Sequence, residues 1–249
     1  QLELGRLYRA QSRGALSVIH LEAAYQAAEI GTLEPLETGP EWARQVAVSA
    51  LEAQGILARE GGRVSESVGF FERALDIAGD DDAMAAQALL GLASSRHRQE
   101  DFGGALEILG SALEKARQAH DRILMGRILN NTGITHHIAG RFEEALAHYR
   151  EARDLYRSVG YPFGLVVSLH NMGDSHMRLG NHGRAWAAFE ESRKLAEEVG
   201  LPLGTVLNEP FMAYLEALRA QEGGGAAEPD VFVERIEAIV EDAKRMGDM

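Results

Sequence analysis

Cysteine is absent from this sequence of 249 residues, which excludes disulfides, thiolate metal ligands and cysteine nucleophiles. Long apolar runs are absent too, because none approaches the roughly 18 residues that a membrane-spanning helix needs. We therefore expect no membrane partner. Aromatic residues make up only 6% of the chain. The residues that dominate instead are alanine, leucine, glutamate and arginine, which favour helices.

Positive charge is in deficit, and the net charge is −13. A nucleic-acid partner is disfavoured, because neutralising phosphates requires clustered lysine and arginine. The acidic balance keeps a helical protein in solution and is compatible with a basic partner.

An internal repeat of about 40 residues is the strongest pattern in the sequence. Residues 129–152 match residues 169–192 with a constant offset of 40, and the linkers at 160–164 and 200–204 repeat with the same offset. Two earlier copies, at about 89–112 and 51–74, precede them with offsets of 40 and 38. Four consecutive copies at this regularity are not expected by chance.

Each copy reads as two amphipathic helices. Leu129 to Ala139 and Phe142 to Tyr156 both carry small or apolar residues at i, i+3, i+4 and i+7. Gly140 lies between these halves, where a tight turn favours a residue without a β-carbon. Glycine inside a helix costs about 1 kcal/mol relative to alanine. We therefore expect Gly133 and its counterpart Gly173 to allow close packing of a neighbouring helix.

This pattern resembles the tetratricopeptide repeat, which has a small residue in the first helix, a turn glycine, and then alanine, a large apolar residue and alanine in the second. The resemblance covers residues 43–200 clearly. Two features depart from it. The period is 40 instead of about 34 residues, as in a longer-helix branch found in many multidomain bacterial regulators and some eukaryotic adaptors. In addition, His136 and His176 stand where the family often has tyrosine.

The resemblance implies an all-α fold, a right-handed α-solenoid of antiparallel helix pairs whose first helices line a concave face. We expect residues 1–42 to form an N-terminal helix pair (a degenerate or capping repeat) and residues 43–200 to form four clear repeats. Residues 201–249 are expected to form a fifth repeat with a loop insertion at about 222–229 and a second helix over 231–246.

The first helix of the fifth repeat is expected from about Thr205 to Gln221. Because Pro210 lies within it, this helix should start late or be kinked. The chain begins at Gln1 instead of methionine and ends where a sixth repeat would start. We therefore expect the native protein to continue.

The candidate ligand-binding residues are those that the family pattern places on the concave face. An amide side chain both donates and accepts, so a row of asparagines can bond the main chain of an extended peptide, and related repeat proteins use groove asparagines in this way. Arginines there can hold a carboxylate. The candidates are Arg98, Arg127, Asn130, Asn131, His137, His170, Asn171, Asp174 and Arg178. The alternative is that the asparagines bond within their own repeat and the arginines pair with neighbouring acids.

No spacing indicates a cofactor, a metal or a catalytic centre. His136 and His137 are adjacent, and adjacent residues of a helix point in different directions. The aspartate run at 80–82 lacks the glycine and glutamate of a calcium loop. It reads as the end of one helix and the cap of the next. We expect no enzymatic activity.

The leading hypothesis is a scaffold that binds a protein or an extended peptide and belongs to a larger, cytoplasmic bacterial regulatory protein. The sequence is also compatible with assembly into homo-oligomers. The alternative is a receptor for a signalling peptide or small ligand that switches an attached effector domain. That alternative predicts a change of shape when the ligand binds.

Overall fold

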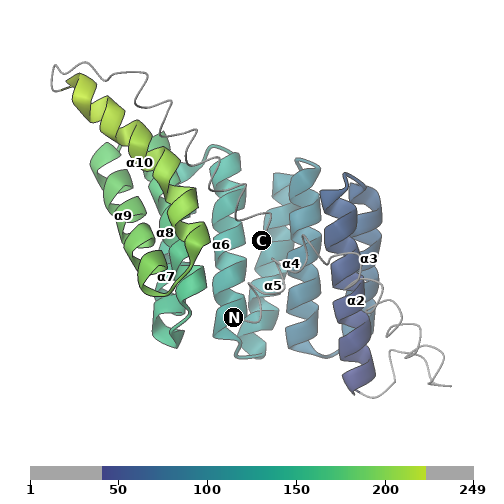
Figure 1. The fold of residues 1–249 in the computed structure, drawn as a ribbon. Coiled ribbons are helices and arrows are strands. Elements are labelled where there is room, and N and C mark those ends of the chain that lie inside the picture. Colours follow the sequence, from purple (N-terminus) through teal and green to yellow (C-terminus); the bar gives the residue numbers. More distant parts are fainter. Residues whose placement is uncertain (1–40, 223–249) are drawn as a thin grey trace. The chain divides into compact units, whose positions relative to one another are not determined.

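The computed structural model describes residues 41–222, which form helices and no strand. The expected N-terminal helix pair, the loop insertion and the helix over 231–246 lie outside these residues. The helices are drawn in Figure 1. In chain order they are α2 (Glu41–Glu60), α3 (Val64–Ala78), α4 (Asp82–Arg98), α5 (Phe102–Gln118), α6 (Arg122–Ile138), α7 (Phe142–Val159), α8 (Pro162–Arg178), α9 (His182–Glu198) and α10 (Pro202–Glu222).

The chain divides into two compact units, Gln1–Leu124 and Met125–Met249, and the boundary falls in the first turn of α6. In the first unit each helix from α2 to α5 packs against the next one, and α2 also contacts α4. In the second unit α7, α8, α9 and α10 pack in the same serial way, and α8 contacts α10. Figure 1 shows that consecutive helices within each unit run antiparallel. The fold is therefore all-α, built from helix pairs in series.

Glycine in the first helix of a pair makes room for an aromatic ring of the second. A β-carbon at Gly133 would lie 2.5 Å from Cε1 of Tyr149, and one at Gly173 would lie 2.5 Å from Cε1 of Phe189. In the first unit, Phe71 fills the corresponding space beside Gly55. The predicted close packing at Gly133 and Gly173 is confirmed.

Turn residues also follow the sequence prediction. Gly140 has a φ of 75°, a left-handed conformation that residues with a β-carbon rarely adopt. Asp81 is the N-cap of α4, and its Oδ1 accepts hydrogen bonds from the backbone N–H groups of Ala83 and Met84 at 3.0 and 2.9 Å. The interpretation of the aspartate run as a helix cap is thereby confirmed.

The predicted late start of the fifth repeat's first helix is wrong. This helix, α10, begins at Pro202, three residues before the expected Thr205, just as α8 begins at Pro162. Proline suits the first helical position, because its fixed φ matches the helix and no intrahelical N–H bond is required there. The helix then continues through Pro210 to Glu222.

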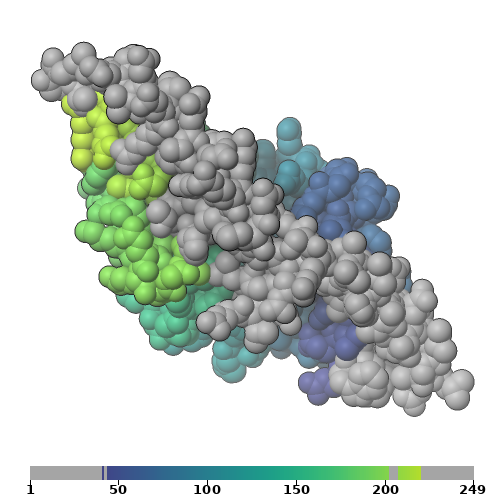
Figure 2. All heavy atoms as spheres, viewed as in Figure 1, coloured from purple at the N-terminus to yellow at the C-terminus, as the bar shows by residue number. Residues whose placement is uncertain are grey.

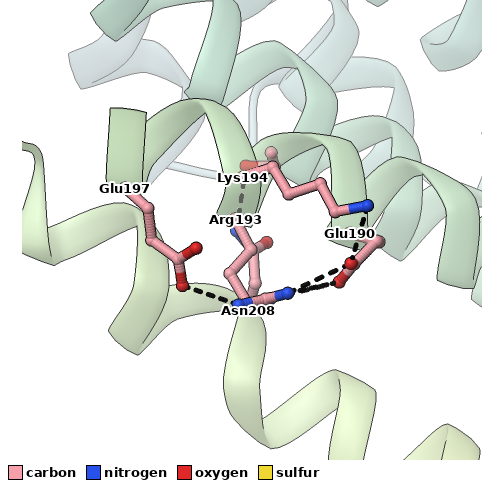
Figure 3. A network of polar contacts seen from close by, with 6 residues as sticks. Glu190, Arg193, Lys194, Glu197 and Asn208 are labelled. Atoms are coloured by element: carbon pink, nitrogen blue, oxygen red, sulfur yellow. Dashed lines mark hydrogen bonds and ion pairs between the residues drawn. The ribbon is translucent and has the colours of Figure 1, made fainter. Parts of the chain in front are cut away.

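Salt bridges stabilise α9 along its own axis. Figure 3 shows Glu190 between Arg193 and Lys194, with Arg193 also reaching Glu197. Such pairs, spaced three or four residues apart, each contribute about 0.3–0.5 kcal/mol.

Helix α9 also packs against α10, and the spheres of these two helices touch in Figure 2. Among the described helices, none combines the length and the apolar character that crossing a membrane requires.

Candidate functional site

Polar side chains connect the first helices of successive repeats in the second unit. Nδ2 of Asn171 in α8 donates to Oδ1 of Asn130 in α6 at 3.1 Å, and Oγ of Ser168 donates to the same oxygen at 3.4 Å. Asn130 is only 7% exposed. Its oxygen therefore holds Asn171 in position from within the interface between α6 and α8.

Asn131 and Asn171 occupy equivalent positions of the two repeats and are both partly exposed. Nδ2 of Asn131 donates to the backbone oxygen of Arg127 at 2.9 Å. Each amide thus uses one N–H within the protein: Asn131 bonds within its own repeat, as the alternative interpretation has it, whereas Asn171 bonds the preceding repeat. An amide has a second N–H and an oxygen with two lone pairs, so each asparagine retains groups that can bond a ligand.

A charged cluster lies about one helical turn after Asn171 on α8. It consists of His137, Asp174 and Arg178. Nε2 of His137 lies 3.2 Å from Oδ2 of Asp174, and Nε of Arg178 lies 3.5 Å from Oδ1. Burial by itself raises the pKa of Asp174. The hydrogen bond and charge of His137, together with the charges of Arg178 and His170, lower the pKa by more, so it lies below the ordinary aspartate value. Asp174 is therefore an anion held between two basic side chains.

A serine completes this cluster without forming a catalytic triad. Nδ1 of His137 lies 2.8 Å from Oγ of Ser175, while its other ring nitrogen faces Asp174. A nucleophile must reach its substrate, and Ser175 is 0% exposed. The arrangement therefore fixes the orientation of His137 between α6 and α8.

The interface between α8 and α10 repeats the polar contact seen between α6 and α8. Nδ1 of His170 lies 2.9 Å from Oδ1 of Asn208, and Nδ2 of Asn208 donates to Oγ of Ser192 at 2.9 Å. The Asn208 amide is visible beside α9 in Figure 3. An amide oxygen can only accept, so Nδ1 of His170 carries the proton. Burial lowers the pKa of His170, although Asn208 and Asp174 partly oppose this effect.

The three predicted arginines lie on three different helices, α4, α6 and α8. Arg178 joins the Asp174 cluster, and Arg127 lies on α6, where its backbone oxygen holds Asn131. Arg98 ends α4 in the first unit and is exposed. The charge of Arg98 affects Arg59 on α2. Burial lowers the pKa of Arg59, the charge of Glu60 partly opposes this effect, and the charge of Arg98 lowers the pKa of Arg59 further.

Sequence reasoning missed a pocket of about 550 Å³ at α8, α9 and α10. Six residues line it: Met177, Arg178, His182, Pro210, Phe211 and Tyr214. Phe211 and Tyr214 lie 40 residues after Asn171 and Asp174. Extending the repeat register into the fifth copy would have found them. Among the described residues, no group of three or more histidine, aspartate or glutamate side chains is placed to hold a metal ion.

Comparison with known proteins identifies the repeat. Residues 84–158 match the family model of the tetratricopeptide repeat. No curated protein matches the chain.

Several solved structures share the fold at low sequence identity. BtubC (BKLC) from P. vanneervenii is 16% identical with a TM-score of 0.69, and the alignment covers 94% of this chain and 92% of that one. Aspartyl phosphate phosphatase F from Bacillus subtilis is 15% identical with a TM-score of 0.70; the alignment covers 94% of this chain but 58% of that one.

A third structure is a Rap protein complexed with Competence and Sporulation Factor. It is 13% identical with a TM-score of 0.64, and the alignment covers 80% of this chain and 54% of that one. At these identities the likeness concerns the fold. The match to residues 84–158 and the serial helix pairs described above support a tetratricopeptide repeat protein.

Proposed function

We propose that this chain binds an extended peptide, or an extended segment of a protein, along the first helices of its second unit. The observation that carries the proposal is the polar row on α6 and α8, in which Asn131 and Asn171 recur at one repeat position. A buried acceptor, Asn130, holds the second asparagine. Preorganised amides bind a peptide main chain with little loss of side-chain entropy.

The polar row has the chemistry that a main chain requires. Peptide groups need both donors and acceptors, and the amides of Asn131 and Asn171 offer both. Asp174, His137 and Arg178 lie one to two turns along and add charge of both signs. His170 is engaged with Asn208, so in this proposal it fixes the spacing between α8 and α10. Arg98 and Arg127 remain candidates for contacts with acidic side chains of the ligand.

The fold relatives support a binding role, since one of them is a Rap protein complexed with Competence and Sporulation Factor. We place the chain in a larger, cytoplasmic bacterial regulatory protein, in which it serves as a scaffold and performs no chemistry. A receptor that switches an attached effector is the competing possibility. It predicts a change in the radius of gyration on binding, which small-angle scattering of the full-length protein would detect.

The test is a binding screen of the protein against an array of synthetic heptapeptides, followed by fluorescence titration of the tightest one. Replacing Asn131 and Asn171 together by alanine should weaken binding by about tenfold or more, because two main-chain hydrogen bonds are lost at about 0.5–1.5 kcal/mol each. The matched control is Asn181→Ala, an exposed asparagine that makes no side-chain cap bond.

Melting curves of both variants must show that each protein is folded at the titration temperature. Unchanged affinity in the folded double variant would refute the proposed binding face.

A further inference from the structure

The pocket at α8, α9 and α10 continues the polar row with a different chemistry. Phe211 and Tyr214 stand on α10 where Asn171 and Asp174 stand on α8. Because α8 and α10 are in contact, a ligand that follows the row from α6 to α8 next meets aromatic rings instead of amides. The surface therefore changes from main-chain recognition to side-chain recognition at this point.

The pocket wall is held rigidly from behind. The ring of Phe211 stacks on Phe189 with centroids 5.1 Å apart and meets His170 edge-on at 5.3 Å. Phe189 is fully buried. In contrast, 46% of Tyr214 is exposed at the mouth of the pocket. A fixed apolar wall with an exposed aromatic rim suits an inserted apolar side chain, because little ordering is required on binding.

Size and charge specify the occupant. A volume of about 550 Å³ lies within the range of small-ligand sites and exceeds what one aromatic side chain needs. Of the six lining residues, Arg178 is the only one with a permanent charge, and its side chain is 59% exposed. Its contact with Asp174 runs through Nε at 3.5 Å. A guanidinium has five N–H donors, so Arg178 can bind a second carboxylate.

We propose that this pocket anchors an aromatic or branched apolar side chain of the bound peptide, with a carboxylate of the same ligand paired to Arg178. This inference rests on the proposed function. Arg178 follows Asn171 by seven residues, which is about 10 Å along a helix and about three residues of an extended peptide. This rise along α8 is a minimum for the path to the pocket, so the anchor residue is expected three or more positions from the residue whose main chain bonds Asn171.

The first test uses 3-phenylpropionate, a ring attached to a carboxylate, titrated into protein labelled with ¹³C at the methionine methyls. Met177 lines the pocket, whereas Met172 is buried in the core around Tyr149. The Met177 signal should shift with saturation while the Met172 signal stays in place. Tyr214→Ala should weaken binding by about tenfold, and Tyr214→Phe should retain it, because the ring supplies the contact.

Charge is tested with 3-phenylpropanamide, which has the ring but no carboxylate. It should bind several-fold more weakly than 3-phenylpropionate, and this difference should disappear in Arg178→Gln. The matched control is Ile138→Ala. Ile138 is the exposed counterpart of Arg178 on α6 and should leave both affinities unchanged.

The same variants separate this inference from the proposed function on the heptapeptide array. Both proposals stand under two conditions. Tyr214→Ala must remove the preference for an apolar residue in the peptide, and the double variant Asn131→Ala/Asn171→Ala must weaken the binding of all peptides. If the asparagine variant weakens binding and folded Tyr214→Ala does not, the anchor site is wrong and the binding face survives. A Met177 signal that 3-phenylpropionate leaves unmoved would also overturn the anchor site.

Discussion

At the level of single residues, glycine and an aromatic ring form the basic contact between the two helices of a repeat. The ring of Phe189 lies against the backbone of Gly173, and Phe189 is fully buried, so it has no space into which to move. Tyr149 and Gly133 make the same contact one repeat earlier. The helical cost of glycine is thereby offset by aromatic burial, which contributes about 25 cal/mol per Å².

Gly173→Ala should destabilise the protein by about 1–2 kcal/mol. Alanine improves helix propensity by up to about 1 kcal/mol, but overpacking against Phe189 costs about 1–3 kcal/mol. The measurement is the urea midpoint followed by far-ultraviolet circular dichroism. Gly110→Ala is the control, because a β-carbon there meets nothing within 4 Å. That control should be stabilised, and a stabilised Gly173→Ala would contradict the packing argument.

At the level of helices, the ends are set by local chemistry that the chain carries at each boundary. Asp81 caps α4 with two hydrogen bonds, and Asp101 caps α5 by accepting from the N–H of Gly104 at 2.9 Å. Proline begins α8 and α10. These signals act over three or four residues, so they are readable without knowledge of the tertiary structure.

Asp81→Ala should lower the free energy of unfolding by about 1 kcal/mol, since two backbone N–H groups at the start of α4 lose their acceptor. The comparison is with Asp80→Ala, which removes the same charge from an exposed neighbour that is not the cap. Equal urea midpoints for the two variants would show that charge, and not capping, accounts for the effect.

At the level of the whole molecule, we expect partly or fully buried histidines to make stability depend on pH. Burial lowers the pKa of all four histidines concerned below the ordinary histidine value of 6.5. Nearby arginines lower it further for three of them, while Asn208 and Asp174 partly oppose the effect at His170. The four are His97, His136, His170 and His176. Two of these, His136 and His176, stand at the position where the family often has tyrosine.

Stability should therefore fall as the pH drops below about 6.5. In this window the unfolded chain binds protons that the folded chain does not, so acid favours unfolding. Urea midpoints measured between pH 8 and pH 5 should decline on the acid side. The decline should be shallower in the double variant His136→Gln/His176→Gln, which lacks two of the four titrating histidines. A midpoint independent of pH over this range would refute the assignment.

Much of the fold was predictable from the sequence, because a repeat protein is built from short-range contacts. Within each unit, helices from α2 to α5 and from α7 to α10 pack against the next helix, and α2 with α4 and α8 with α10 also pack against the next but one. The 40-residue register, the turn at Gly140 and the close packing at Gly173 follow from residues near one another in the chain. The start of α10 was predicted three residues too late, although proline at position 202 suits the first helical position.

The site was less predictable, for a physical reason. Spacing along a helix determines which residues share a face, and it brought Asn131, Asn171, Asp174 and Arg178 into consideration. Which atoms bond depends on the placement of helices about 40 residues apart. Only the tertiary structure showed Asn130 turned inward to hold Asn171, and only packing of α8, α9 and α10 created the pocket beside Tyr214. Periodicity thus determined the architecture, while contacts between repeats decided the chemistry of the surface.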